Sequence, residues 1–103
     1  MKQKKQWRQG DVLVESVKAL PEGFQHQRGR VILADGEATG HVHEIDEEEG
    51  ELWKMREEIA VRVVRDSATL HHQEHGPIKI ARGSYVVTRQ REYTPGEIRR
   101  VAD

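Results

Sequence analysis

Short runs rich in β-branched residues, separated at close intervals by turn-forming residues, constrain the fold of this chain more than any other feature. Apolar and polar residues alternate near 11–17, 29–34 and 39–45, which is the period-two pattern of half-buried strands. Pro and Gly within 20–23, and the Asp35-Gly36 pair, are residues that favour turns between such strands. The pattern predicts an all-β fold.

The middle of the chain allows two interpretations. From 53 to 63 apolar residues fall mainly at odd positions, which favours a strand, and β-branched residues dominate from Ile59 onward. Leu52, Met55 and Ile59 also have helical spacing, so a helix over 51–59 is the alternative. We expect the strand.

Turns are also expected at Asp66-Ser67 and at 81–84, with the last strand over 84–93. The run Thr-Pro-Gly-Glu at 94–97 has the residues of a helix start, with Thr as N-cap and Pro at the first helical position. We therefore predict a small barrel or a double-sheet sandwich of seven or eight strands, followed by a short C-terminal helical turn.

Length and charge limit the domain organisation and the partners. With 103 residues the chain is long enough for one domain, for which we expect a basic flexible arm at 1–9 and a single β domain at 10–103. The formal net charge of −1 provides no global field that attracts nucleic acid or an anionic membrane. The basic arm, which contains Trp7, nevertheless leaves an RNA- or protein-binding adaptor as an alternative.

Hydropathy indicates the cellular location that we expect, and composition indicates how such a domain could be stabilised. No apolar run approaches the roughly 20 residues needed to span a bilayer, and no secretory signal pattern follows the basic N-terminus, so we expect a cytoplasmic protein. Only 35% of the residues are hydrophobic, so the core is thin. A thin core gains stability from a metal crosslink or from homo-oligomerisation.

Five of the six histidines lie in two short groups, His41 with His43, and His71, His72 with His75. In a strand, residues two apart point to the same face at a spacing of about 6.6 Å, so the first two imidazoles share a face. Alternation allows only one of the adjacent pair in the second group to face the site. We predict that both groups meet around one divalent metal ion; the alternative is two groups that face solvent.

The chemistry of such a site follows from the donors present. There is no cysteine, so imidazole and carboxylate groups would hold the ion, with Zn²⁺ expected and Fe²⁺, Ni²⁺ or Mn²⁺ as alternatives. An open coordination position would polarise a small-molecule substrate or activate water, with Glu37 or Glu74 as the catalytic base of a hydrolytic or lyase-type reaction. The residues do not decide between this enzyme and a non-catalytic binding or assembly module with a structural metal.

The segment GHVHEIDE, at 40–47, resembles the first motif of the cupin superfamily, in which His-x-His is followed by a Glu ligand. GPIKIARGSYV, at 76–86, resembles the second motif, but Val86 stands where cupins place their last histidine ligand. This resemblance implies a cupin-like double-sheet sandwich and a bound metal, with one of the later histidines substituting for the missing ligand.

A second resemblance covers more of the chain. GEATGHVHEI, HHQEHGPIKI and TRQREYTP are similar to segments of an uncharacterised family of short bacterial and phage proteins. It spans most of residues 10–101 and implies no activity.

Overall fold

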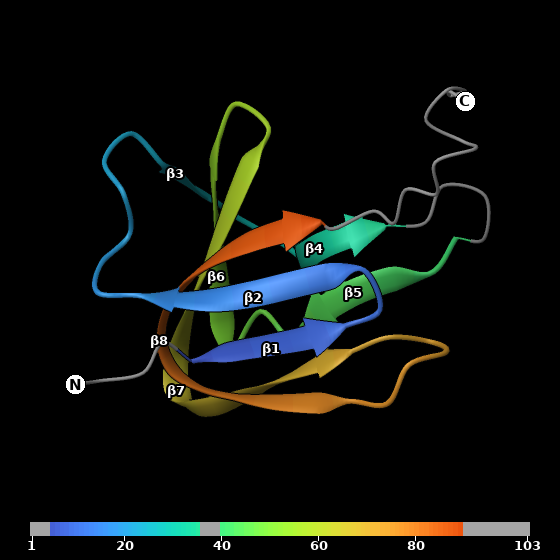
Figure 1. Cartoon of the computed structure of the whole chain (residues 1–103). Coiled ribbons are helices and arrows are strands. Elements are labelled where there is room, and N and C mark those ends of the chain that lie inside the picture. Colours follow the sequence, from blue (N-terminus) through green and yellow to red (C-terminus); the bar gives the residue numbers. More distant parts are fainter. Residues whose placement is uncertain (1–4, 36–39, 90–103) are drawn as a thin grey trace, which may run out of the picture.

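A computed structural model describes residues 5–35 and 40–89, and all regular elements in these ranges are β-strands (Figure 1). The strands are β1 (Gln6–Gln9), β2 (Val12–Val17), β3 (Gln25–Gln27), β4 (Val31–Asp35), β5 (Val42–Ile45), β6 (Gly50–Met55), β7 (Glu58–His71) and β8 (Ile78–Arg89). The predicted all-β class is confirmed.

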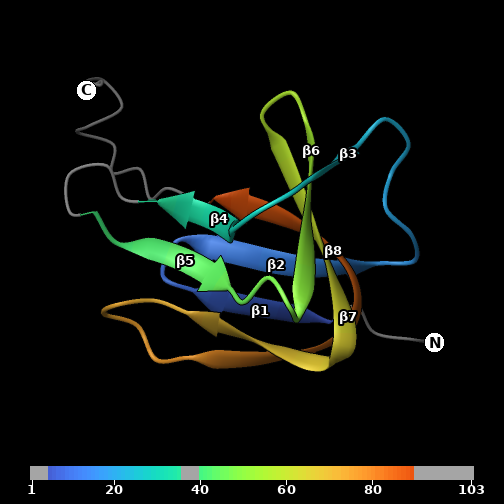
Figure 2. The ribbon, with the colours of Figure 1, turned by 180° about the vertical axis from the view of Figure 1, so that it is seen from behind.

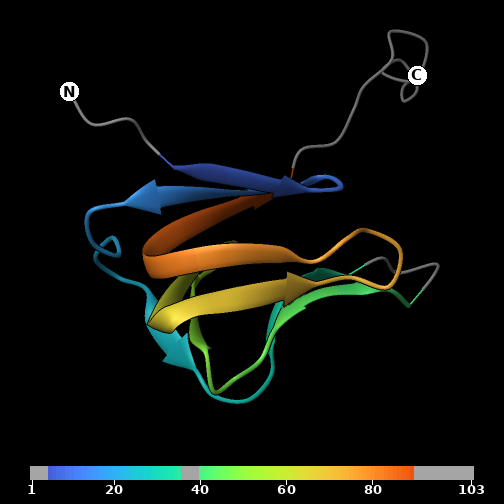
Figure 3. The same ribbon diagram turned by 90° about the horizontal axis from the view of Figure 1, so that it is seen from below.

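The eight strands form one antiparallel sheet that curls into a half-barrel (Figure 3). Its main path runs β1-β2-β8-β7-β5-β4, while β6 pairs with β7 and carries β3 on its other side. The first part of β7 pairs with β6 and its last residues pair with β5. This change of partner is made at a register irregularity between Val63 and Ser67, because a β-bulge bends a strand and increases its twist.

The core lies inside the curl and consists mainly of aliphatic side chains. Val12, Val14, Ile45, Leu70 and Ile80 are completely buried. They alternate along their strands with more exposed residues, as the period-two pattern of the sequence predicts. The small aliphatic core agrees with the low hydrophobic content of the chain.

Two predicted turns are absent, because β7 and β8 run through them. The Asp66-Ser67 pair lies inside β7 at the bulge, and 81–84 lies inside β8. Gly83 has φ 151°, which lets β8 bend without breaking, and the Tyr85 hydroxyl donates a hydrogen bond to the Ala81 carbonyl at 2.6 Å. Polar residues and glycine occur both in turns and at bends of long curled strands. Local composition therefore does not distinguish the two, and the two turn predictions are wrong.

The stretch from 51 to 59 forms two strands rather than the alternative helix. Strand β6 ends at Met55, and a tight turn follows in which Arg56 has the positive φ of 58°. The break in alternation that the sequence shows at this point is the turn of the β6–β7 hairpin.

Part of the expected N-terminal arm belongs to the sheet. Gln6–Gln9 forms β1, which pairs antiparallel with β2, so the expectation of a flexible arm through residue 9 is wrong for these residues. The Trp7 ring packs edge-on against Tyr85 with ring centres 5.4 Å apart. This aromatic contact stabilises the pairing of an otherwise polar edge strand.

The end of the last predicted strand, 90–93, the predicted helical turn after Thr94, and Glu37 lie outside the described residues. The described part of the chain has no helix with the length and apolar character that crossing a bilayer requires.

Candidate functional site: a histidine cluster

Four imidazole rings gather at one end of the half-barrel. There the β1–β2 turn, the start of β5 and the β7–β8 connection lie on the same side of the molecule (Figures 1 and 2). We call the set His41, His43, His72 and His75 the histidine cluster. Its ring centres are 4.3 Å apart for His43–His72, 4.6 Å for His72–His75, 5.5 Å for His41–His72 and 6.1 Å for His43–His75.

Strand pairing explains the meeting of the two groups. β5 and β7 are antiparallel neighbours in which Glu44 pairs with His71 and Ile45 with Leu70. The residue before Glu44 and the residue after His71 therefore lie side by side beyond the paired segment. These are His43 and His72, which is why two groups separated by about thirty positions in the sequence come together.

His43 is the buried member of the cluster, with 5% of its surface exposed. Its Nδ1 lies 2.8 Å from Oε1 of Gln9, which is itself only 2% exposed. The Gln9 amide nitrogen donates to the carbonyls of Leu70 and Gly76, both at 2.9 Å. Because both amide hydrogens are used, the amide oxygen can only accept, and His43 Nδ1 must carry the hydrogen.

The protonation state of His43 follows. Burial lowers the pKa of His43 to about 4, and the neighbouring His72 acts in the same direction, so the ring is neutral at pH 7. A neutral imidazole with its hydrogen on Nδ1 has a free lone pair on Nε2. This orientation, with Nδ1–H held by a fixed oxygen, is the one that supports metal ligation through Nε2.

A carboxylate stands in front of that lone pair. Asp11 Oδ1 lies 3.9 Å from His43 Nε2, and Asp11 Oδ2 accepts a hydrogen bond from Arg89 at 2.9 Å. Burial alone would raise the pKa of Asp11, but the Arg89 hydrogen bond and charge outweigh it and lower the pKa. Asp11 is therefore an ionised oxygen donor held beside a nitrogen donor.

The remaining members come from more open positions. His41 is 26% exposed in its side chain, and its Nδ1 lies 3.7 Å from Oε1 of Glu74. His72 Nδ1 accepts the backbone N–H groups of Glu74 at 3.0 Å and of His75 at 3.2 Å. Burial lowers the pKa of His72, and the nearby His75 and His41 add to this effect.

The β1–β2 turn fits closely against the cluster at Gly10. Its φ is 60°, and a Cβ atom built there would lie 2.6 Å from His75 Nε2. Only glycine allows the turn and the ring to approach this closely. The end of β1 and the turn after it therefore contribute to the site through Gln9, Gly10 and Asp11.

The structure places the other predicted site residues as follows. His71 is exposed on β7 and pairs with Glu44 outside the cluster. Glu74 lies in the β7–β8 connection beside His41, whereas Glu37 is not among the described residues. Sequence reasoning did not single out Gln9 or Asp11, and the only sequence signal they carry is their place on either side of Gly10, directly before a strand.

The donor types and spacings fit a borderline divalent ion. Two donor atoms bound to one ion at 2.0–2.1 Å lie about 3–4 Å apart, and the ring centres of two bound imidazoles lie about 4.5–6 Å apart. The His43–Asp11 distance and the ring spacings are close to these ranges. Within 5–35 and 40–89, however, no three such side chains are arranged to hold an ion as they stand. Binding would require the more exposed rings to turn toward His43.

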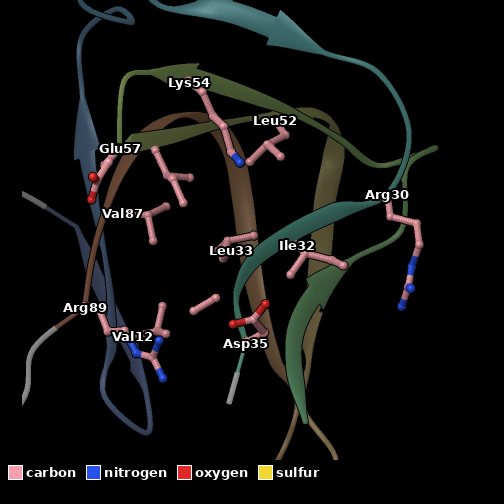
Figure 4. A pocket seen from close by; sticks show the side chains of 12 residues that line it. Val12, Arg30, Ile32, Leu33, Asp35, Leu52, Lys54, Glu57, Val87 and Arg89 are labelled. Atoms are coloured by element: carbon pink, nitrogen blue, oxygen red, sulfur yellow. The ribbon is translucent and has the colours of Figure 1, made fainter. Parts of the chain in front are cut away.

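A cavity of about 620 Å³ adjoins the site, between β2, β4, β8 and the β6–β7 hairpin (Figure 4). Its lining is mixed, with apolar side chains such as Leu33 and Val87 beside charged ones such as Lys54 and Glu57. Arg89 belongs both to this lining and, through its bond to Asp11, to the surroundings of the cluster. Its volume is in the range of small-molecule sites.

The fold and the cluster together define a small all-β domain with a curled antiparallel sheet and an imidazole-rich site at one end. A family model described as Domain of unknown function (DUF8820) matches residues 8–90, and the chain belongs to this family. This agrees with the expectation of an uncharacterised family. No curated protein and no solved structure matches the chain.

Proposed function

We propose that the protein binds one divalent transition-metal ion, with Zn²⁺ as the first choice, at the histidine cluster. The observation that carries this proposal is His43, a buried neutral imidazole whose Nε2 lone pair has no hydrogen-bond donor among residues 5–35 and 40–89 and lies beside an ionised carboxylate. Leaving such a lone pair without a partner in a buried position is costly, and an ion would satisfy it.

The convergence of three further imidazoles supports the same function. Each lies with its ring centre within 6.1 Å of another member of the cluster. Their neutral forms suit Zn²⁺, with Fe²⁺, Ni²⁺ and Mn²⁺ as alternatives. The resemblance of 40–47 to the first cupin motif adds a separate reason to expect a metal there.

A catalytic role follows if one coordination position stays open. A bound ion would then activate water or polarise a small substrate in hydrolytic or lyase-type chemistry. The adjoining cavity offers a volume for the substrate, and Glu74, whose side chain is 69% exposed, stands at the cluster as the base. A purely structural ion in a binding or assembly module is the second candidate, because the ion would connect β5, the β1–β2 turn and the β7–β8 connection.

The first test is metal content. Protein purified without a histidine tag should contain close to one metal ion per chain by elemental analysis after equilibration with Zn²⁺ and gel filtration. His43→Ala and His41→Ala should each reduce the content more than His26→Ala. His26 is the matched control, because its ring stacks on Trp53 away from the cluster.

Two outcomes would contradict the proposal. One is wild-type protein that retains no ion; the other is equal metal content in all three variants. His71→Ala is a second control, since His71 belongs to the same sequence group but lies outside the cluster.

A further inference from the structure

His72 contacts the other three members of the cluster, yet its hydrogen bonds leave neither of its nitrogens with a lone pair for a metal ion. Its Nδ1 accepts the N–H groups of Glu74 and His75, at 3.0 and 3.2 Å, and must therefore have a lone pair rather than a hydrogen. A neutral imidazole has one N–H, which is then on Nε2. In this state the ring has no lone pair left to offer a metal ion.

We infer, on the basis of the proposed metal site, that His72 positions the β7–β8 connection and does not bind the ion. Its ring accepts hydrogen bonds from the backbone N–H groups of Glu74 and His75. These bonds fix the direction in which the connection leaves β7. The ligands assigned by this geometry are His43, with Asp11 and His75 beside it; His41 contacts His72 and Glu74 and is the next nearest imidazole.

The buried side of this set is the best defined. His43 directs its lone pair toward Asp11, whose second oxygen is held by Arg89. A ligating carboxylate that is hydrogen-bonded through its other oxygen is a common supporting arrangement. His43 and Asp11 thus provide one nitrogen and one oxygen donor that need little movement.

The open side is supplied by His75 and His41, which are more exposed than His43. The His75 ring is nearly parallel to that of His43, with an interplanar angle of 17° and centres 6.1 Å apart. The backbone N–H of His75 is one of the two that His72 holds, so the contact acts directly on this ligand. His43, His75 and Asp11 provide two nitrogens and one oxygen, and the fourth position of a tetrahedral Zn²⁺ ion is then taken by His41, whose ring contacts His72, or by water.

Replacing His72 by Asn and by Gln distinguishes a positioning role of this residue from metal ligation. In His72→Asn the side-chain oxygen takes the place of Nδ1 and can accept both backbone hydrogens. In His72→Gln the polar atoms take the place of Nε2 and cannot reach them. A positioning residue should be rescued by Asn and not by Gln, whereas a ligand should be replaced by neither.

The experiment is a Zn²⁺ competition titration against a chromophoric chelator, on full-length variants whose folding is checked by circular dichroism. His72→Asn should bind Zn²⁺ within about threefold of wild type, and His72→Gln about 10–100-fold more weakly, the usual cost of losing a supporting contact. His43→Asn and His75→Asn should lose more than either. Equal losses in His72→Asn and His75→Asn would overturn the inference.

A spectroscopic measurement decides the same point without substitution. Long-range ¹H–¹⁵N spectra of the metal-free protein should show the hydrogen of His72 on Nε2 and that of His43 on Nδ1. On addition of Zn²⁺ the ¹⁵N shift of His43 Nε2 should change strongly, while both nitrogens of His72 should keep their values. Coordination shifts at His72 would refute its positioning role but not the metal site; failure of wild-type protein to bind Zn²⁺ would refute both.

Discussion

The buried contact between His43 and Gln9 determines how the site responds to protons. A second hydrogen on His43 would have to go to Nε2, where burial and the neighbouring imidazoles disfavour positive charge by more than ionised Asp11 favours it. Gln9 meanwhile binds the carbonyls of Leu70 and Gly76, at the two ends of the β7–β8 connection. The buried amide of Gln9 thus fixes both the His43 ring and the β7–β8 connection.

The lowered pKa of His43 should make the free energy of unfolding depend on pH. An unfolded histidine takes up its proton as the pH falls through about 6.5, whereas folded His43 stays neutral down to about 4. The unfolded state therefore binds more protons in this window, and stability present above pH 6.5 is lost as the pH falls toward 4. The loss should reach about 3 kcal/mol below that window.

Urea unfolding of chelator-treated protein at pH 7.5 and pH 4.5 measures this effect. His43→Asn retains a donor toward Gln9 but does not titrate, so its stability should fall less between the two pH values than that of wild type. His26→Asn is the control and should behave as wild type does. The same slope in wild type and His43→Asn would contradict the assignment.

The β1–β2 turn and the long strands show how elements carry the site. Gln9, at the end of β1, and the turn residues Gly10 and Asp11 reach the cluster only because β1 pairs with β2, and β2 pairs with β8. Strands β7 and β8 remain continuous through the two predicted turns, where Ser67 pairs with Ala81 and Val63 with Gly83. This cross-strand pairing outweighs weak local preferences, which depend strongly on context in β-structure.

Gly10→Ala tests the close approach of the turn to His75. Gly40→Ala is the matched control, because Gly40 has a similar positive φ of 75° but a Cβ there would meet nothing within 4 Å. Both variants should lose a similar amount of stability, about 1 kcal/mol, from left-handed backbone strain. Only Gly10→Ala should displace His75.

The displacement should appear as weaker Zn²⁺ binding in a competition titration and as changed His75 ring signals in NMR spectra. His75 is exposed and can rotate away, so we expect the effect in affinity more than in stability. Identical Zn²⁺ affinities in the two glycine variants would show that the contact has no role in the site.

Considered as a whole, the molecule is a curled sheet that stops short of a full barrel and has a core of small aliphatic side chains. The histidine cluster lies where three separate parts of the chain approach one another at one end of this sheet. An ion bound there would connect β5, the β1–β2 turn and the β7–β8 connection, and would therefore stabilise the fold against global unfolding.

Thermal and urea unfolding with and without Zn²⁺ measure this coupling. At a free Zn²⁺ concentration of 100 times the dissociation constant, the free energy of unfolding should increase by about 2.7 kcal/mol. The increase should disappear in His43→Ala and persist in His71→Ala. Chelated protein that unfolds outright would favour a structural ion, and chelated protein that stays folded would favour a catalytic one; no increase in wild type would contradict the site.

The sequence by itself predicts the all-β class and the two histidine groups, because alternation and composition are local properties of the chain. It does not predict β1, the continuity of β7 and β8, or the presence of Gln9 and Asp11 beside His43. Those contacts join residues 34 positions apart for His43–Gln9 and 61 apart for Gln9–Leu70, and both depend on how the sheet curls. Which nitrogen of each histidine is free, and therefore what the cluster can bind, is set by hydrogen-bond partners that only the folded chain brings together.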